Sequence, residues 1–360
     1  MNHNQTEQLV ACPECDRLYR WLDIPPDAKA SCSRCRVELY RHVPDSLTRS
    51  LAWYVTAFMF LCIANLMPFL SMSAVGLERR NLMMSGALAL AEFGMPELGV
   101  LVFCTSIGFP LLTIAGMLWL LIPACFGRLA WGAEFCYRWV HHLSPWSLLG
   151  VFMLGTLIAF VKLQDLAAVS PGPGLFAFAG MLLAYTAGRA AFSPEVFWSL
   201  KKVSRRRSVG GPHIRCHICG LVLAHGDHHC PRCESRVHHR EQGSLEKTAA
   251  LTLAAAIMFI PANLFPIMMV SKLGQGHPDT ILSGVISLMQ GGMFGLALIV
   301  LFASIIVPLL KLVVLTFLIY TVHKGVRWRP RDRTLLYRLT EVVGAWSMVD
   351  IFLVGLLSGL

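Results

Sequence analysis

The sequence predicts an all-α polytopic membrane protein with two transmembrane modules that are parallel repeats, each preceded by a small cysteine-rich module. Three observations lead to this fold class. Mean hydropathy is +0.59, and 55% of the residues are hydrophobic against 14% charged, which excludes an ordinary soluble globular protein. Eight of the twelve cysteines fall into four C-x-x-C pairs in polar stretches. The two apolar halves repeat the same short motifs at a nearly constant offset.

Residues 1–49 are expected to form an N-terminal zinc ribbon. Cys12 and Cys15 make one C-x-x-C turn, Cys32 and Cys35 make another, and sixteen residues separate the two turns. Two such turns can present four thiolates in a tetrahedron, and their spacing is typical of a structural Cys₄ site. A polar domain of about forty residues buries too little apolar surface to fold without such a crosslink. This stretch also excludes a cleavable signal peptide, so we expect the first span to be an uncleaved anchor.

Residues 50–192 are expected to form the first transmembrane module, with about four helices. Asn65 and Pro68 interrupt the first apolar stretch, and Pro110 should kink the second. Within a membrane such a proline is tolerated where neighbouring groups satisfy the freed carbonyls, and Thr105 lies one turn earlier. The expected spans are 50–72, 97–122, 146–163 and 174–192.

Residues 193–247 combine a basic linker with a second expected zinc ribbon. The basic run at 201–207 follows a span directly, where it would meet anionic lipid headgroups. Ten residues separate the two C-x-x-C turns of the ribbon, and several histidines surround them. Four cysteines complete a metal site, so we interpret the histidines as surface residues rather than ligands. The expected ligands are Cys216, Cys219, Cys230 and Cys233.

Residues 248–360 are expected to form the second transmembrane module, with about three helices that span 248–270, 294–322 and 341–360. The pair Asn65/Pro68 recurs as Asn263/Pro266, and the Trp-Ser pair at Trp146 recurs at Trp346. The offset is 198 residues for the first motif and 200 for the second. Fourteen residues follow Trp346, whereas the first repeat continues through another span. We therefore expect the second module to lack the last helix of the first.

The distribution of Lys and Arg predicts the topology. These residues number seven in 1–50, ten in 193–247 and six in 323–340. The intervening loops near 73–95 and 271–293 contain few. The positive-inside rule then places the N-terminus and both ribbons in the cytoplasm, where their thiols also stay reduced. Because both modules begin on the same side, the repeats are parallel rather than inverted.

Four ionisable residues lie in or at the edge of the spans: Lys162, Asp165, Lys311 and Asp350. A charge at the bilayer centre costs about 2.5–3.5 kcal/mol on insertion scales, so such residues usually face a bundle interior and mark a functional site. A purely structural role, as ion pairs or as groups reaching the membrane surface, is the alternative. The sequence contains no nucleophile–base arrangement, phosphate-binding loop or haem motif, so it predicts no enzyme.

Taken together, these features resemble the paraquat-inducible protein A family of membrane proteins. The residues that carry the resemblance are the eight ribbon cysteines, the Trp-Ser motifs at Trp146 and Trp346, and the stretches 161–165, 279–284 and 307–311. The resemblance implies a multi-pass protein of the bacterial inner membrane that moves phospholipids together with a periplasmic partner containing MCE domains. It also implies four helices in each half and a central polar cavity formed by Lys162, Asp165, Ser304, Lys311 and Asp350.

Two other function classes remain open at this point. In a membrane redox protein acting on quinone, the C-x-x-C turns would hold iron as in rubredoxin. Cys219-Gly220 fits an iron-binding turn, but Cys15-Asp16 and Cys35-Arg36 do not. In a membrane-tethered regulator, the basic ribbons would contact nucleic acid. Few aromatic residues lie among these basic residues, so we expect no nucleic-acid partner.

Overall fold

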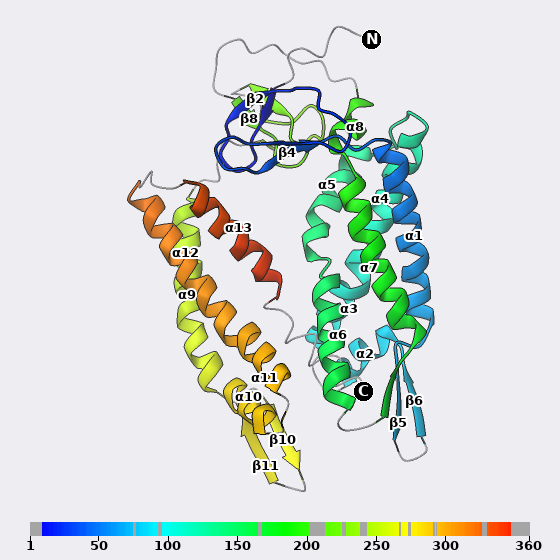
Figure 1. Cartoon of the computed structure of the whole chain (residues 1–360), viewed down its shortest axis with the longest axis vertical. Helices are drawn as coiled ribbons and strands as arrows, with labels where there is room; N and C mark the ends of the chain where they lie inside the picture. Colours follow the sequence, from blue (N-terminus) through cyan, green and yellow to red (C-terminus); the bar gives the residue numbers. More distant parts are fainter. Residues whose placement is uncertain are drawn as a thin grey trace. The chain divides into compact units, whose positions relative to one another are not determined.

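The computed structural model is mainly helical and divides into two compact units, which are described separately (Figure 1). The first unit runs from residue 9 to 153 and from 169 to 237, and the second from 154 to 168 and from 243 to 346. The residues described are 9–74, 77–92, 96–164, 168–201, 213–224, 228–237, 243–265, 268–272, 275–290, 292, 294–325 and 330–346.

The two cysteine modules are built from β-hairpins in the first unit. In the N-terminal ribbon, β1 (Leu9–Ala11) pairs with β2 (Leu18–Arg20), and β3 (Lys29–Ser31) pairs with β4 (Glu38–Arg41). In the second ribbon, β8 (His213–Arg215) pairs with β9 (Val222–Ala224). An isolated bridge joins His229 to Arg236 and closes the second turn. Each C-x-x-C pair thus lies at the tip of a short antiparallel ladder.

Helices α1 (Ser46–Leu66) and α7 (Pro173–Ala191) form the tightest pair of the first membrane module. Small residues on α7 allow the close approach, because a Cβ at Gly188 or Gly180 would lie 3.1 Å from the ring of Tyr54 or Phe60. Ser50 Oγ also donates a buried hydrogen bond of 3.0 Å to the Gly188 carbonyl.

The end of α1 is fixed to the start of α7 by backbone contact. The amide of Gly172 donates to the Phe69 carbonyl at 3.1 Å, and the amide of Gly174 donates to the Pro68 carbonyl at 3.0 Å. A Cβ on Gly172 would lie 2.1 Å from the Pro68 oxygen, so only glycine fits there. Beside this junction the rings of Phe69, Phe152 and Phe178 form a core in which each is at most 2% exposed.

A long irregular helix crosses the same module. It consists of α3 (Pro96–Phe103), a π-helical turn η1 (Cys104–Gly108) and α4 (Phe109–Cys125), and follows the short helix α2 (Met83–Glu92). The kink expected at Pro110 therefore takes the form of a π-turn just before the proline. The Thr105 hydroxyl donates to the Leu101 carbonyl at 2.8 Å and not to the Ser106 carbonyl, which is the one that Pro110 leaves without an amide partner, so this bond does not compensate for the proline as expected.

Between the expected spans 97–122 and 146–163, where no helix was predicted, the chain returns along α4. Helix α5 (Ala133–Leu143) packs against α4, and the 3₁₀ turn η2 (Ser144–Trp146) separates it from α6 (Leu149–Gln164). Trp146 lies at this break with its ring 6.5 Å from that of Phe109. The amphipathic helix α5 was missed because its charged and histidine residues resemble those of a cytoplasmic loop. The short helix α8 (Pro194–Ser199) follows α7.

Strands at the ends of the helices correct the expectation of a purely α-helical protein. In the first module β5 (Leu70–Ala74) pairs with β6 (Leu77–Asn81) and with β7 (Ala168–Pro171), in the order β6-β5-β7. The expected spans 50–72 and 248–270 were consequently too long. The first helix ends at Leu66 and its counterpart ends at Leu264, each a few residues before a strand.

The second unit has the same order of elements. Its helix α9 (Ser244–Leu264) is followed by the hairpin of β10 (Met268–Lys272) and β11 (Gln275–Asp279). Next come α10 (Ile281–Gln290), α11 (Phe294–Leu301), a second π-turn η3 (Phe302–Ile306), α12 (Val307–His323) and α13 (Pro330–Trp346). Helix α12 packs against both α9 and α13. Most of the last expected span, 341–360, lies outside the described residues.

Five helices in the described part of the chain are long and apolar enough to cross a membrane: Ser46–Leu66, Gly99–Cys125, Pro173–Ala191, Ser244–Leu264 and Ser304–His323. Helix α6, which was expected as a span, has 16 residues.

The junction between α1 and α7 generates a prediction. Gly172→Ala should lower the stability of the first module by about 1–3 kcal/mol, because the new methyl group overlaps the Pro68 carbonyl. Gly150→Ala is the matched control, since nothing lies within 4 Å of its Cβ position. Unfolding of both variants in detergent measures the difference. Equal stability of the two variants would contradict the close approach.

Candidate metal centres and intramembrane polar site

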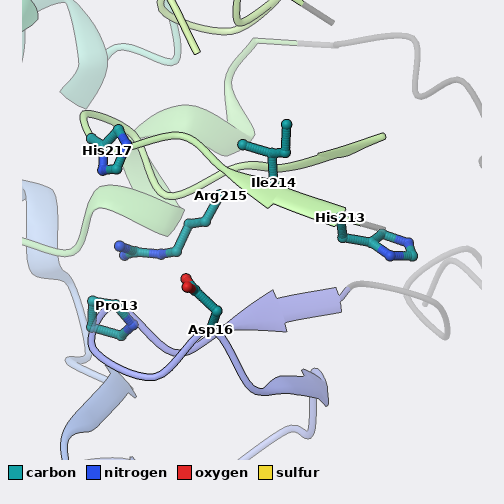
Figure 2. Close-up of a pocket in the computed structure, with 6 residues that line it drawn as sticks. All are labelled: Pro13, Asp16, His213, Ile214, Arg215 and His217. Atoms are coloured by element: carbon teal, nitrogen blue, oxygen red, sulfur yellow. The ribbon is translucent and has the colours of Figure 1, made fainter. Parts of the chain in front are cut away.

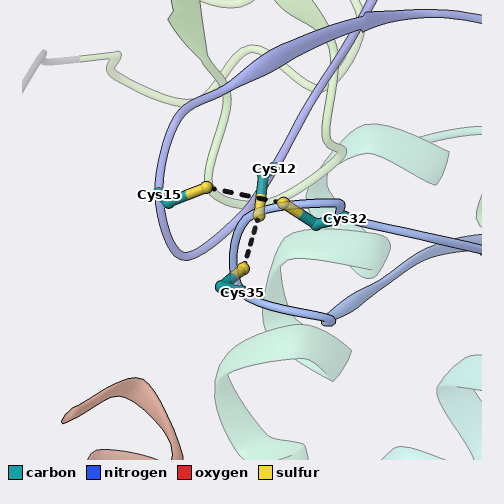
Figure 3. Close-up of side chains that lie close together, drawn as sticks. All are labelled: Cys12, Cys15, Cys32 and Cys35. Carbon is teal, nitrogen blue, oxygen red and sulfur yellow. Dashed lines mark hydrogen bonds between the residues drawn. The ribbon is translucent and has the colours of Figure 1, made fainter. Parts of the chain in front are cut away.

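The four cysteines of the N-terminal ribbon converge on one point. The Sγ atoms of Cys12 and Cys35 lie 3.4 Å apart, and those of Cys15 and Cys32 lie 3.6 Å apart (Figure 3). All four Sγ atoms are within 4.8 Å of one another. Three of the four side chains are buried, and Cys15 is half-buried.

The second ribbon repeats this geometry. Cys216 Sγ lies 3.5 Å from Cys233 Sγ, Cys219 Sγ lies 3.5 Å from Cys230 Sγ, and all four cysteines are buried. A tetrahedral metal with bonds to sulfur of about 2.3 Å needs sulfur–sulfur distances of about 3.8 Å. Both sets of thiols therefore fit one metal ion each, with no ligand beyond the four cysteines.

The backbone explains why each C-x-x-C sequence folds into such a turn. The amide of the first cysteine bonds to the carbonyl five residues later in every turn, at 2.8–2.9 Å. The residue after the second cysteine has positive φ in every case. Its amide bonds back to the first cysteine's carbonyl at 2.7–3.1 Å. These four residues are Asp16, Arg36, Gly220 and Glu234.

Hydroxyl groups beside the sulfurs favour the thiolate forms. In the N-terminal ribbon, burial of Cys32 opposes ionisation, but hydrogen bonds from the Tyr19 hydroxyl and from nearby backbone amides lower its pKa to about 6. Burial raises the pKa of Cys12. In the second ribbon the Ser235 hydroxyl lies 3.2 Å from Cys216 Sγ and 3.1 Å from Cys233 Sγ. A metal ion must displace the remaining thiol protons, so binding depends on pH.

The expected intramembrane polar residues are only partly described. Lys162 lies near the end of α6, whereas Asp165 and Asp350 fall outside the described residues. Ser304 lies in the π-turn η3 and is buried. Lys311 lies on α12 and is half-buried in an otherwise apolar helix. Pairing between Lys162 and Asp165, or between Lys311 and Asp350, therefore stays a prediction.

Lys311 reaches the backbone of the neighbouring helix α13. A Cβ added at Gly344 would lie 2.9 Å from Lys311 Nζ, so the absence of a side chain at Gly344 leaves the space that the ammonium group fills. Sequence reasoning selected Lys311 but missed Gly344. Only the tertiary contact between α12 and α13 brings the two together.

Residues 47–201 and 245–360 match the family model described as Paraquat-inducible protein A. The chain belongs to the paraquat-inducible protein A family. The matched ranges contain both membrane modules and leave out the two ribbons.

Similar curated proteins cover nearly all of this chain. Lipophilic envelope-spanning tunnel protein A of Escherichia coli (strain K12) is 31% identical over 354 residues, which are 97% of this chain and 81% of that protein. Intermembrane transport protein PqiA of the same organism is 29% identical over 371 residues, which are 99% of this chain and 88% of that protein. No solved structure matches this member of the family. The similarity to transport proteins is consistent with a membrane transport role.

Metal analysis tests the two Cys₄ centres. The purified protein should contain two equivalents of bound metal, and Cys15→Ser or Cys219→Ser should each remove about one equivalent. Cys62→Ser is the control, because Cys62 lies on α1 away from both clusters. Elemental analysis by mass spectrometry measures the content. Undiminished metal in Cys15→Ser and Cys219→Ser would rule out these ligand sets.

The N-terminal centre should lose metal on acidification. The lowered pKa of Cys32 keeps the metal-free thiolate ionised above about pH 6, and because a bound metal competes with the proton, protonation removes this ligand as the pH falls below that value. Tyr19→Phe removes a hydrogen bond to the thiolate and raises the pKa, so metal release should move about one pH unit upward.

Tyr40→Phe provides the matched control for this titration. The Tyr40 hydroxyl lies in the same ribbon and, within the described residues, forms its hydrogen bonds with the backbone of Leu22 rather than with a sulfur. Metal retention is followed with a colorimetric chelator from about pH 8 to about pH 4. A release midpoint that is the same in Tyr19→Phe and in wild type would refute the role of the Tyr19 hydroxyl.

Proposed function

We propose that this protein is an integral inner-membrane subunit of a phospholipid transport system. It passes lipid to or from a periplasmic tunnel-forming partner with MCE domains, by way of a polar cavity within the membrane modules. The names of the two E. coli relatives, a tunnel protein and an intermembrane transport protein, support this proposal. The N-terminus and both ribbons are cytoplasmic, zinc occupies both Cys₄ centres, and neither catalysis nor nucleic-acid binding is involved.

The proposed organisation keeps the boundaries drawn from the sequence. The N-terminal zinc ribbon is 1–49, the first transmembrane module 50–192, the linker with the second ribbon 193–247 and the second module 248–360. Lys162, Asp165, Ser304, Lys311 and Asp350 are the proposed cavity residues.

The observation that carries the proposal is the position of Lys311. An ammonium group within an apolar membrane helix is costly unless it faces polar atoms or water. Here it lies against the backbone of α13 at Gly344. Lys311 follows the buried Ser304 of η3 by seven residues. Single π-turns inside α-helices occur frequently at functional sites. A cation held in this way can attract the phosphate of a lipid headgroup.

Lys311→Ala should reduce phospholipid transfer about tenfold or more, because the cavity loses its fixed cation. Lys324→Ala is the matched control, since Lys324 is an exposed lysine at the end of the same helix. Transfer of labelled phospholipid is measured from proteoliposomes that contain the protein to an acceptor that carries the periplasmic partner. Wild-type transfer by Lys311→Ala would overturn the cavity assignment.

Gly344→Ala gives a second test of the same site. The new methyl group would shift the Lys311 ammonium, at the end of a flexible side chain, without removing its charge, so transfer should fall but by less than in Lys311→Ala. Gly295→Ala provides the comparison, because no atom lies within 4 Å of its Cβ position. Transfer that falls in Gly344→Ala and not in Gly295→Ala supports the cavity. Unchanged transfer in both variants contradicts it.

A further inference from the structure

The second cysteine module contacts the membrane module that precedes it in the chain. Lys201 follows α8, and its Nζ donates to Glu134 Oε1 on α5 at 2.7 Å and to the Arg232 carbonyl at 2.9 Å. Arg232 lies between Cys230 and Cys233, inside a metal-binding turn. A single ammonium group thus joins α5, the end of α8 and the second metal centre.

The other metal-binding turn of this ribbon makes a similar contact. His141, near the end of α5, has its Nε2 3.4 Å from the carbonyl oxygen of His217. His217 lies between Cys216 and Cys219. Both C-x-x-C turns therefore present a main-chain carbonyl to a side chain associated with the first membrane module. Such carbonyls point in a fixed direction only while the turn keeps its fold.

Helices α5 and α8 form one packed surface beneath these contacts. The Tyr137 ring of α5 stacks on Phe197 at 5.9 Å and meets the edge of Trp198 at 5.1 Å. Phe197 and Trp198 are both completely buried. The ion pair between Lys201 and Glu134 has only 24% of each side chain exposed, so solvent screens it less than a surface pair.

Helix α5 is in turn seated closely on α4. Cys136 Sγ lies 3.5 Å from the Gly116 carbonyl, and a Cβ at Gly116 would lie 2.5 Å from a methyl group of Val140. Any movement of α5 away from α4 would expose the Cys136 thiol. This native cysteine is a reporter of how α5 is seated.

The N-terminal ribbon contacts the second ribbon through a separate surface. Its residues Pro13 and Asp16 line a small cavity together with His213, Arg215 and His217 of the second ribbon, and Asp16 and Arg215 face each other across it (Figure 2). Strand β1 also lies against β9. The two polar contacts described above that join a ribbon to α5 or to Lys201 both come from the second ribbon, through the carbonyls of His217 and Arg232.

We propose that the second metal centre is a clamp on the first membrane module, holding α5 and α8 in place through the carbonyls of His217 and Arg232. Metal binding folds the two C-x-x-C turns and so fixes both carbonyls. Loss of this metal releases α5 from α4 near the α5–α6 break, while the N-terminal centre has no such effect. The clamp is independent of which molecule the membrane modules transport.

The test measures the rate at which N-ethylmaleimide alkylates Cys136, resolved by peptide mass spectrometry in the full-length protein in native membranes. Cys62, which is exposed on α1, provides the internal reference. Cys219→Ser should accelerate alkylation of Cys136 about tenfold or more, because contacts to charged groups are lost. Cys15→Ser, the matched change in the N-terminal centre, should leave the rate unchanged.

Lys201→Ala isolates the clamp from the fold of the ribbon. It should also accelerate alkylation of Cys136, while two metal equivalents stay bound. Lys201→Arg keeps a cation with several N–H donors at this position and should protect Cys136 better than Lys201→Ala does. Lys29→Ala is the charge control, because it removes an exposed ion pair to Glu38 in the N-terminal ribbon. Unchanged Cys136 reactivity in Lys201→Ala and Cys219→Ser, or an equal rise in Cys15→Ser, would overturn the proposal.

Discussion

The structure depends on the requirement that backbone polar groups within a bilayer find partners inside the protein. The candidate membrane-crossing segments are helices, and two interruptions of helices in the first module are compensated locally. At η1 the hydroxyls of Thr105 and Ser106 bond to carbonyls of the preceding turn. At the junction of α1 and α7, the amides of Gly172 and Gly174 bond to carbonyls that follow α1. Outside the two ribbons, each strand in the described part of the chain lies next to the end of a helix.

The same requirement applies to charged side chains that are partly buried. Lys311 lies in an apolar helix because Gly344 leaves room for it beside the α13 backbone. On the first unit, Lys201 connects two helices to a metal-binding turn through one half-buried ammonium group. In both places a lysine joins segments that are distant in the sequence. Lys201 contacts the main-chain carbonyl of Arg232 as well as the Glu134 side chain, and Lys311 lies beside the main chain at Gly344.

Local patterns in the sequence were sufficient to predict the two Cys₄ clusters and the long apolar helices. The spacing of Cys12, Cys15, Cys32 and Cys35 implies a closed Cys₄ cluster because each turn is formed by its own few residues. The β5–β7 strands, α5 and the contact of the second ribbon with α5 were not predicted. They depend on pairing over long separations, such as the 67 residues between Glu134 and Lys201. Lys162 could be chosen from hydropathy alone, but no local signal indicates its partner.

The central claim is that the protein works on phospholipid with a periplasmic partner, and one measurement tests it most directly. The protein is purified in mild detergent from native membranes, and the proteins, lipids and metals that accompany it are identified by mass spectrometry. A partner with MCE domains, bound phospholipid and zinc is the result that this account predicts. Iron together with a quinone, and no such partner, would contradict it and favour a membrane redox protein.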